Sequence, residues 1–303
     1  MLGKFLDPKN DIAFRKIFGT EKNKDILIHF LNDVIEFEEG SPIEEVTFLK
    51  TIQDPEIRAK KTSIVDILCK DEKGNRYIVE MQVAKEKGFE KRAQYYASKA
   101  YASQMNSRGK FHALKAVIFL AIADFIMFPK KKEYKSDHII LDKKSYENDL
   151  KDFSFTFLEL PKFKKNINQL SNPTEMWAYF FKHAEETSPE DLQKLIDHEH
   201  IIARAYEELD RYTWNEEELL SYEQAEKYEA TYIASMDQKF DEGKVEGEKI
   251  GIEKGEKIGI EKGEKTALFR VARHLLKQGL PISDIEQATG LSEQEIDALQ
   301  NSS

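Results

Sequence analysis

The chain has 303 residues, of which 40% are apolar and 34% charged, and its formal net charge is −10. This composition allows a sizeable core, and the length indicates one larger domain with further segments. The single cysteine, Cys69, excludes an intramolecular disulfide, which fits a reducing cytosol. Because no run approaches the roughly 20 apolar residues of a membrane span or resembles a signal peptide, we expect a cytoplasmic protein without membrane contact.

The front half of the chain alternates helical and strand patterns. Asp7 and Pro8 are residue types that favour the N-cap and first position of a helix, and an apolar stripe at helical spacing follows until Gly19. Further elements are predicted as a helix over 23–35, strands over 44–52, 62–70 and 76–83, a helix over 89–105, and strands over 114–125, 138–141 and 153–160. This order predicts an α/β or α+β domain with a mixed sheet, ending near residue 165.

The rear half reads differently. Residues 166–242 have the apolar spacing of amphipathic helices, and residues 243–265 repeat glycine at every fourth position. Each glycine costs an isolated helix about 1 kcal/mol relative to alanine, so a flexible charged linker is one interpretation. The other is a helix, supported by ordered pairs such as Glu253 with Lys257, whose glycines let a partner helix approach. The helical alternative leads us to expect a homo-oligomer.

Residues 266–303 have the outline of a helix-turn-helix hairpin. Two capping boxes, Ser283 with Glu286 and Ser292 with Glu295, flank a turn at Gly290. The second helix, S-E-Q-E-I-D-A-L, has no Lys or Arg, whereas helices that read DNA normally carry basic phosphate contacts. We therefore favour a small structural or protein-binding hairpin over a DNA reader.

The charges are unevenly divided. Residues 1–165 hold 31 Lys and Arg against 26 Asp and Glu, whereas residues 166–303 hold 15 against 30. A basic front half beside an acidic rear half can accompany a domain that binds a polyanion. Chance produces the same split, so this division alone assigns no function.

The strands over 62–70 and 76–83 read as a hairpin around D-E-K-G-N, in which paired positions sum to 146. This register places one apolar set on a common face: Val65 with Met81, Ile67 with Val79, and Cys69 with Tyr77.

The same register places Asp66 opposite Glu80 on the other face, with Gln82 two residues farther along. Side chains so paired lie roughly 4.5–5.5 Å apart, and like charges there are destabilising, the more so when buried. A divalent cation between the carboxylates reverses the sign. The alternative is a solvated sheet surface, where Lys61 or Lys99 pairs with the acids.

These residues carry a resemblance to a known family. Asp66 in S-I-V-D-I-L, with Glu80 and Gln82 in V-E-M-Q, looks like the D…E-x-K motif of PD-(D/E)xK nucleases. More closely, the chain resembles the Rpn family of recombination-promoting nucleases, also labelled PD-(D/E)xK transposases. The resemblance covers roughly the first 165 residues, through D-P-K-N-D-I-A-F-R-K-I-F-G at 7–19, K-T-S-I-V-D-I-L at 61–68, Y-I-V-E-M-Q at 77–82, K-R-A-Q-Y-Y-A-S-K-A-Y at 91–101 and F-L-E-L-P-K-F at 157–163.

The resemblance implies a restriction-endonuclease-like core in residues 1–165, followed by a helical C-terminal region. It implies a Mg²⁺-dependent endonuclease, with Mn²⁺ as an alternative metal, that hydrolyses double-stranded DNA in recombination, transposition or defence. No small-molecule cofactor is expected. A noncatalytic nuclease-fold module that binds DNA or protein is the alternative, because Gln82 stands where the superfamily has lysine.

The resemblance also implies roles for individual residues. Asp66 and Glu80 are expected to hold the metal, with the backbone carbonyl of Met81 and the carboxylate of Asp11 as further ligands. The alternative for Asp11 is a first-turn acid that interacts with the helix dipole. Gln82 is expected to orient the attacking water by hydrogen bonding.

Gln82 cannot supply the positive charge of the motif lysine, so Lys61 or Lys99 is expected to replace it. Basic side chains around the hairpin and on the following helix are candidates for phosphate contacts. They are Arg58, Lys60, Lys61 and Arg92.

Overall fold

The computed structural model describes residues 4–37, 42–50, 52–53, 63–105, 110–198 and 200–300. The chain divides into two compact units, Met1–Ala230 and Thr231–Ser303. No helix in the described ranges is long and apolar enough to cross a membrane. The cytoplasmic location stays a prediction.

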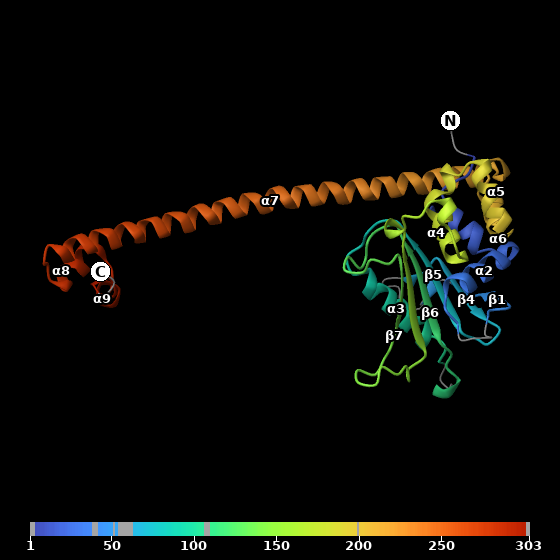
Figure 1. Cartoon of the computed structure of the whole chain (residues 1–303), viewed down its shortest axis with the longest axis horizontal. Helices are drawn as coiled ribbons and strands as arrows, with labels where there is room; N and C mark the ends of the chain where they lie inside the picture. Colours follow the sequence, from blue (N-terminus) through green and yellow to red (C-terminus); the bar gives the residue numbers. More distant parts are fainter. Residues whose placement is uncertain are drawn as a thin grey trace. The chain divides into compact units, whose positions relative to one another are not determined.

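One mixed sheet forms the centre of the first unit, and its strand order is β1-β4-β5-β6-β8-β7 (Figure 1). The strands are β1 Val46–Phe48, β4 Ile67–Asp71, β5 Arg76–Gln82, β6 Val117–Ala123, β7 Lys135–Ile139 and β8 Phe153–Glu159. Strands β5, β6 and β8 are parallel, whereas β4 and β7 run antiparallel to their neighbours. A separate ladder pairs β2, Ile52–Gln53, with β3, Ser63–Ile64. The mixed α/β class is confirmed.

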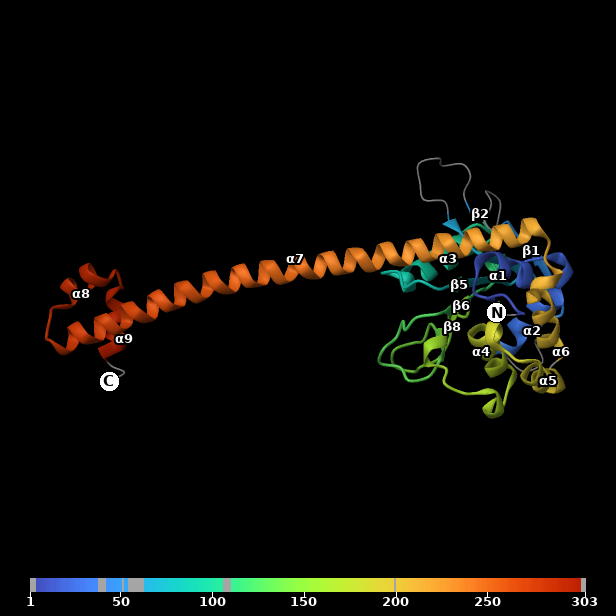
Figure 2. The same cartoon turned by 90° about the horizontal axis from the view of Figure 1, so that it is seen from above.

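Helices cover both faces of this sheet (Figure 2). One face carries α1 Asp11–Phe18, α2 Lys24–Val34, α4 Pro173–His183, α5 Pro189–His198 and α6 His200–Leu209. The opposite face carries α3, Phe89–Ala102. Side chains alternate along a strand, so Val79 of β5 packs in the first layer and Ile78 in the second. Short 3₁₀ turns lie at Glu21–Asn23, Phe111–Ala113, Leu160–Lys162, Ile167–Gln169, Ala184–Glu186 and Arg211–Thr213.

Helices α4, α5 and α6 share a core with the sheet. The Trp177 ring of α4 packs on Phe30 of α2, with ring centroids 5.1 Å apart, and its indole N–H donates to Asp33 Oδ2 at 2.8 Å. The compact unit therefore extends from Met1 to Ala230, past residue 165. The domain boundary expected at residue 165 stays a prediction.

Helix α1 begins one turn later than the sequence pattern suggests. Asn10 is the N-cap, and its side chain accepts a hydrogen bond from the Ile12 N–H at 2.9 Å. Asp7 instead accepts from the Lys9 N–H in the preceding turn. The expected N-cap at Asp7 is therefore wrong, because Asp7 closes its own turn while its N–H donates to the Tyr222 hydroxyl at 3.0 Å.

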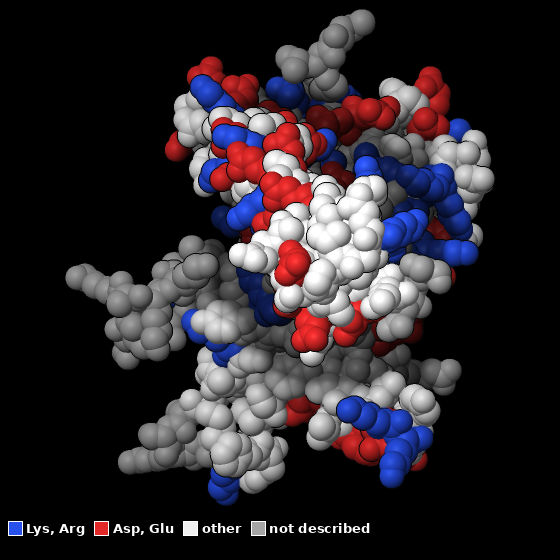
Figure 3. Space-filling model, turned by 90° about the vertical axis from the view of Figure 1, so that its left-hand side faces the viewer, with Lys and Arg blue, Asp and Glu red and all other residues white. Residues whose placement is uncertain are grey.

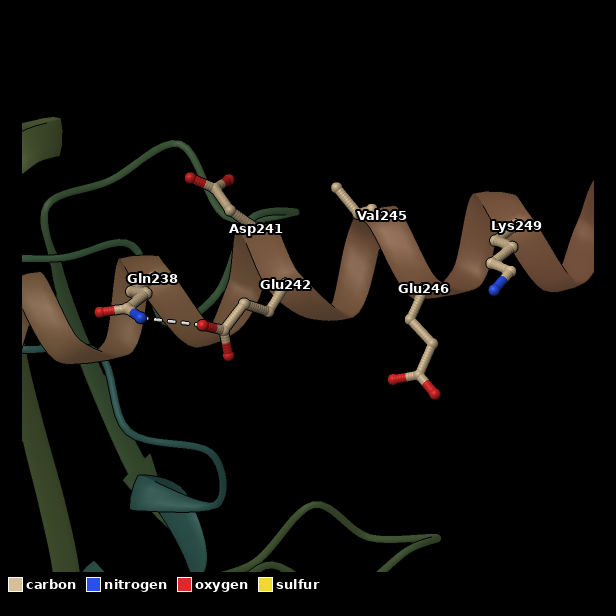
Figure 4. A pocket seen from close by; sticks show the side chains of 6 residues that line it. All are labelled: Gln238, Asp241, Glu242, Val245, Glu246 and Lys249. Carbon is tan, nitrogen blue, oxygen red and sulfur yellow. Dashed lines mark hydrogen bonds between the residues drawn. The ribbon is translucent and has the colours of Figure 1, made fainter.

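Residues Glu216–Lys277 form one continuous helix, α7, so the glycine repeat is helical. A Cβ added at any repeat glycine, from Gly243 to Gly263, meets no described atom within 4 Å. Figure 4 shows a hollow on this helix, where Gln238 donates to Glu242 Oε1 at 2.8 Å. All six side chains that line the hollow come from α7 itself, so we assign no ligand site to it.

The C-terminal hairpin packs on the last turns of α7. Helices α8, Ile282–Thr289, and α9, Glu293–Gln300, bury Ile285 and Ile296 against Ala272 of α7. Gly290 ends α8 in the left-handed region at φ 69°. The capping box at α9 is confirmed, because Ser292 and Glu295 exchange backbone-to-side-chain hydrogen bonds. The box expected at Ser283 is wrong, because α8 already begins at Ile282.

A buried ion pair explains part of the F-L-E-L-P-K-F sequence. Glu159 and Lys162 have side chains only 1% and 7% exposed, and Lys162 Nζ lies 2.6 Å from Glu159 Oε2. The other carboxylate oxygen of Glu159 accepts from the N–H groups of Met127 and Phe128, while Lys162 also donates to the Phe128 carbonyl. The pair therefore anchors the loop after β6.

Replacing Lys162 with Met should lower the free energy of unfolding by about 3 kcal/mol, because it leaves Glu159 buried without its cation. Urea denaturation measures the change. Lys194→Met is the control, because Lys194 pairs with Asp191 at the surface and should change stability by less than about 1 kcal/mol. Equal effects of the two variants would contradict this role.

Candidate active site

The predicted pairing of the hairpin is confirmed along β4, where Ile67 lies opposite Val79. The ladder begins at Ile67, so Asp66 lies immediately before it. Alternation also breaks there, because Val65 packs in the layer beneath α3 whereas Met81 packs in the opposite layer. The expectation that Val65 shares a face with Met81 is therefore wrong.

The structure brings Asp66 and Glu80 together at the end of the β4–β5 ladder. The Asp66 N–H donates to Glu80 Oε1 at 3.3 Å, and the Met81 N–H donates to Asp66 Oδ2 at 3.0 Å. The Asp66 carboxylate thus takes the acceptor position that a strand carbonyl would otherwise fill. The Asp66 side chain is 14% exposed and Glu80 is 5% exposed, so this is not a solvated sheet surface.

Burial of these acids opposes their ionisation. Burial raises the pKa of Glu80 well above its ordinary value, and the negative charges of Asp66 and Asp11 raise it further, against Arg92, which lowers it. The pKa of Asp66 is also raised, chiefly by burial, although the Met81 N–H and Arg15 oppose the shift. The pair is therefore a site where a bound cation is electrostatically favourable.

Helix α1 supplies one acidic and one cationic side chain to this site. Arg15 Nη2 donates to Asp66 Oδ1 at 3.1 Å, and the charge of Asp11 acts on both Asp66 and Glu80. Asp11 and Arg15 are four residues apart and share one side of α1. Sequence reasoning included Asp11 but missed Arg15, although the i,i+4 spacing within D-I-A-F-R was a usable signal.

The first two turns of α7, which include Glu218 and Tyr222, hold α1 in position. The Tyr222 hydroxyl accepts from the Asp7 N–H, and the Tyr222 carbonyl accepts from Asn10 Nδ2 at 3.2 Å. Lys16 Nζ donates to Glu218 Oε1 at 2.6 Å and lies 4.2 Å from the Trp214 ring centroid. The orientation of Asp11 and Arg15 thus depends on residues about 200 positions away in the sequence.

Gln82 lies at the end of β5 with both ends of its amide engaged. Its Oε1 accepts from Arg92 Nη2 of α3, and its Nε2 donates to the Ala84 carbonyl at 3.2 Å. Arg92 also pairs with Glu86. The sequence singled out Arg92 as a phosphate contact and did not connect it with Gln82.

Of the two residues expected to replace the motif lysine, Lys61 and Lys99, only Lys99 lies among the described residues. Lys99 Nζ lies 5.3 Å from the centroid of the Tyr95 ring on α3. Lys61, like Arg58 and Lys60, lies outside the described residues. The backbone N–H of Met81 contacts Asp66, and the ligand role of its carbonyl stays a prediction.

A second ion pair borders the site at the end of β6. The Asp124 N–H donates to the Gln82 carbonyl at 2.9 Å, and its carboxylate accepts from Lys9 Nζ at 2.9 Å. Lys9 also lies 3.7 Å from Asp7. This contact ties the segment before α1 to the strand ends beside Gln82, and no sequence pattern indicated it.

The donor chemistry fits a hard divalent cation with an incomplete protein shell. In the described ranges, no group of three or more His, Cys, Asp or Glu is arranged to hold a metal ion. Asp66 and Glu80 offer carboxylate oxygens, and Mg²⁺ commonly binds one or two carboxylates together with waters and substrate phosphates. Burial raises the pKa of both acids, and the charge of Asp66 raises that of Glu80 further, which is consistent with that arrangement.

The sequence matches two family models. Residues 8–239 match the model described as PD-(D/E)XK nuclease family transposase, and residues 265–301 match the model of the C-terminal HTH domain of the Rpn/YhgA-like nuclease family. No curated protein and no solved structure gives a match.

Glu80→Gln should stabilise the fold in the absence of metal. Because the pKa of Glu80 is raised in the folded state, ionisation opposes folding as the pH rises above the ordinary value of 4.5 through the raised pKa. The variant should therefore gain on the order of 1 kcal/mol in free energy of unfolding at pH 8, and the gain should fade toward pH 4.5.

Urea denaturation in EDTA at several pH values measures this gain. The exposed carboxylate of Glu207 on α6 gives the control variant, Glu207→Gln, which should show no comparable dependence on pH. A Glu80→Gln variant that is less stable than the wild type at pH 8 would contradict the electrostatic interpretation.

Proposed function

Because the chain belongs to the PD-(D/E)XK nuclease family of transposases, we propose that it is a metal-dependent endonuclease that hydrolyses double-stranded DNA. The observation that carries the proposal is the buried pair of Asp66 and Glu80, at the positions that resemble the D and E of the family motif. Nucleases of this family usually use divalent metals, and we propose Mg²⁺, with Mn²⁺ as the alternative. The DNA cut serves recombination, transposition or defence against mobile elements.

Each residue of the site has a proposed task. Asp66 and Glu80 would hold the cation, with Asp11 and the Met81 carbonyl as further ligands. When bound, a divalent metal polarises the scissile phosphate and lowers the pKa of bound water. Arg15 fixes the orientation of the Asp66 carboxylate through Oδ1.

Gln82 has little freedom for chemistry of its own. With Oε1 bonded to Arg92 and one N–H bonded to Ala84, a second N–H is left to orient the attacking water. Gln82 also favours the second candidate function, a noncatalytic nuclease-fold module that binds DNA or protein, because an amide lacks the charge of the motif lysine.

The C-terminal HTH domain supports DNA as the partner. Its α9 helix carries Glu293, Glu295 and Asp297, whereas the nearby end of α7 carries Arg270 and Arg273. If this unit binds DNA, we therefore expect its phosphate contacts on α7 rather than on α9. Figure 3 shows Lys and Arg in several groups, with Asp and Glu among them.

The nuclease proposal predicts that Asp66→Asn and Glu80→Gln each slow the nicking of supercoiled plasmid in Mg²⁺ by at least about 100-fold. The physical reason is loss of a carboxylate that holds the cation. Asp137→Asn is the matched control, because Asp137 is a carboxylate of the same sheet on strand β7 and should cleave at nearly the wild-type rate.

Metal binding has a readout that is independent of cleavage. Mg²⁺ should raise the Tm of the wild type and leave the Tm of Asp66→Asn nearly unchanged, because a ligand stabilises only a fold that binds it. A wild type that neither cleaves DNA in Mg²⁺ or Mn²⁺ nor gains thermal stability would favour the noncatalytic module.

We further propose that the chain forms a homo-oligomer through α7. The repeat leaves Ile252 and Ile260 exposed, and its glycines have open space where a second helix could approach. Such a pair of helices would bury apolar side chains that one chain leaves in water.

Replacing Gly251, Gly255 and Gly259 together with Ala tests the oligomer. The helix itself should gain about 1 kcal/mol per substitution, whereas a glycine-lined contact should weaken because each Cβ enters it. Light scattering coupled to gel filtration should show the wild type as an oligomer and the variant with a lower mass. Lys254→Ala is the control, and a monomeric wild type would contradict the proposal.

A further inference from the structure

Arg92 of α3 is held beside the acid pair by three groups. Its Nη2 donates to Gln82 Oε1, and its Nη1 contacts Glu86 Oε2. Its guanidinium carbon lies 4.8 Å from the centroid of the Phe89 ring. The side chain is 26% exposed, so the cation is partly desolvated yet open to a ligand. Its placement is therefore specific to the end of β5 and not that of a surface arginine free in water.

The charge of Arg92 reaches the carboxylates themselves. It lowers the pKa of Glu80 against the effects of burial and of Asp66. Burial raises the pKa of the Tyr96 hydroxyl, Arg92 opposes that shift, and the charges of Glu80 and Asp66 add to it. Arg92, Tyr96 and the acid pair thus form one electrostatic cluster.

Gln82 links this cation to the strand. In the E-x-K pattern the third residue brings an ammonium group next to the acids, but an amide at that position has no charge to offer. Here the amide oxygen of Gln82 accepts from a guanidinium that comes from α3. Gln82 is therefore a positioning residue for a charge that has moved from the strand to the neighbouring helix.

The other arm of the fork is held by an anion that DNA can replace. The Glu86 side chain is 37% exposed in the loop between β5 and α3, so its contact with Arg92 is open to competition. The two non-bridging oxygens of a DNA phosphodiester match the planar guanidinium fork, as the two oxygens of a carboxylate do. Within the described part of the chain, Arg92 Nε is buried without a hydrogen-bond partner, so one N–H donor of the guanidinium is unused.

We propose that Arg92 binds the scissile phosphate of DNA in place of the lysine of E-x-K, with Gln82 fixing one arm of its guanidinium and Glu86 occupying the other until DNA arrives. The positive charge then offsets charge that develops on the phosphate during hydrolysis. This inference rests on the proposed nuclease function and names the substrate contact of that site.

Binding to a short duplex in EDTA, measured by fluorescence anisotropy between 50 and 200 mM salt, tests the contact without cleavage. Arg92→Gln should weaken binding and reduce the slope of log Kd against log salt by about 1, because one phosphate contact is lost. Lys91→Gln removes the same charge from the adjacent, exposed position of α3 and should leave the slope unchanged. Glu86→Gln should tighten binding several-fold, because it removes the competing anion.

Relocating the charge tests the role in cleavage. Arg92→Gln should slow plasmid nicking about 100-fold, and adding Gln82→Lys to that variant should recover at least about 10-fold, because it restores the cation on the strand. In the wild-type background Gln82→Lys should not accelerate cleavage, because its ammonium group would face Arg92. Thermal unfolding by circular dichroism confirms that each variant is folded.

The outcomes separate this inference from the nuclease function. Arg92→Gln with the affinity, salt slope and nicking rate of the wild type overturns the inference alone, as does a folded double variant no faster than Arg92→Gln. A wild type that shows the expected slopes but cleaves no DNA overturns the nuclease and keeps the phosphate contact. A wild type that neither binds nor cleaves DNA overturns both.

Discussion

The burial of two carboxylates against each other is the constraint on which this site depends. Asp66 and Glu80 are nearly withdrawn from solvent, and their raised pKa values show that the fold opposes their ionisation. Burying like charges is costly unless cations and hydrogen bonds compensate it. Arg15, Arg92 and the Met81 N–H compensate only part of this cost, because the pKa values of both carboxylates remain raised. An acid pair of this kind is consistent with the proposed binding of a divalent cation.

The surrounding structure is arranged to hold this pair. The ladder of β4 with β5 ends one residue after Asp66, which turns its side chain into the acceptor for the next strand N–H. Helix α1 places Asp11 and Arg15 near the acid pair. The first two turns of α7 hold α1 in position through Tyr222. The helical segment from residue 166 to Ala230 thus belongs to the same compact unit as the site and supports it. Long-range contacts of this type make the geometry depend on the whole unit up to Ala230.

With glutamine at position 82, we propose that the positive charge of the site comes from Arg92 of α3. An ammonium group is a compact point charge, whereas a guanidinium is a planar fork with several donors. The fork of Arg92 can bond Gln82 and still present donors to an anion, here Glu86. A noncharged residue in the motif is therefore compatible with a positively charged site. In the proposed mechanism this contact would give α3 a part in the reaction, in addition to its packing against the sheet.

The sequence alone determined the features that depend on neighbouring residues. Apolar alternation and the D-E-K-G-N turn, in which Gly74 takes a φ of 88°, set the register that pairs Ile67 with Val79 and brings Asp66 near Glu80. The turn at Gly290 and the capping box at Ser292 were also readable, because both are local hydrogen-bonding patterns.

Only the tertiary structure decided which distant side chains complete the site. Arg15 reaches Asp66 across 51 positions of sequence, and Tyr222 reaches Asp7 across 215. The layer in which Val65 packs depends on where the β4–β5 ladder ends. The position of the α1 N-cap depends on the contact of Asp7 with α7. Local patterns carry no information on which helix packs over which strand end, because packing is chosen by the shape and burial of the whole core.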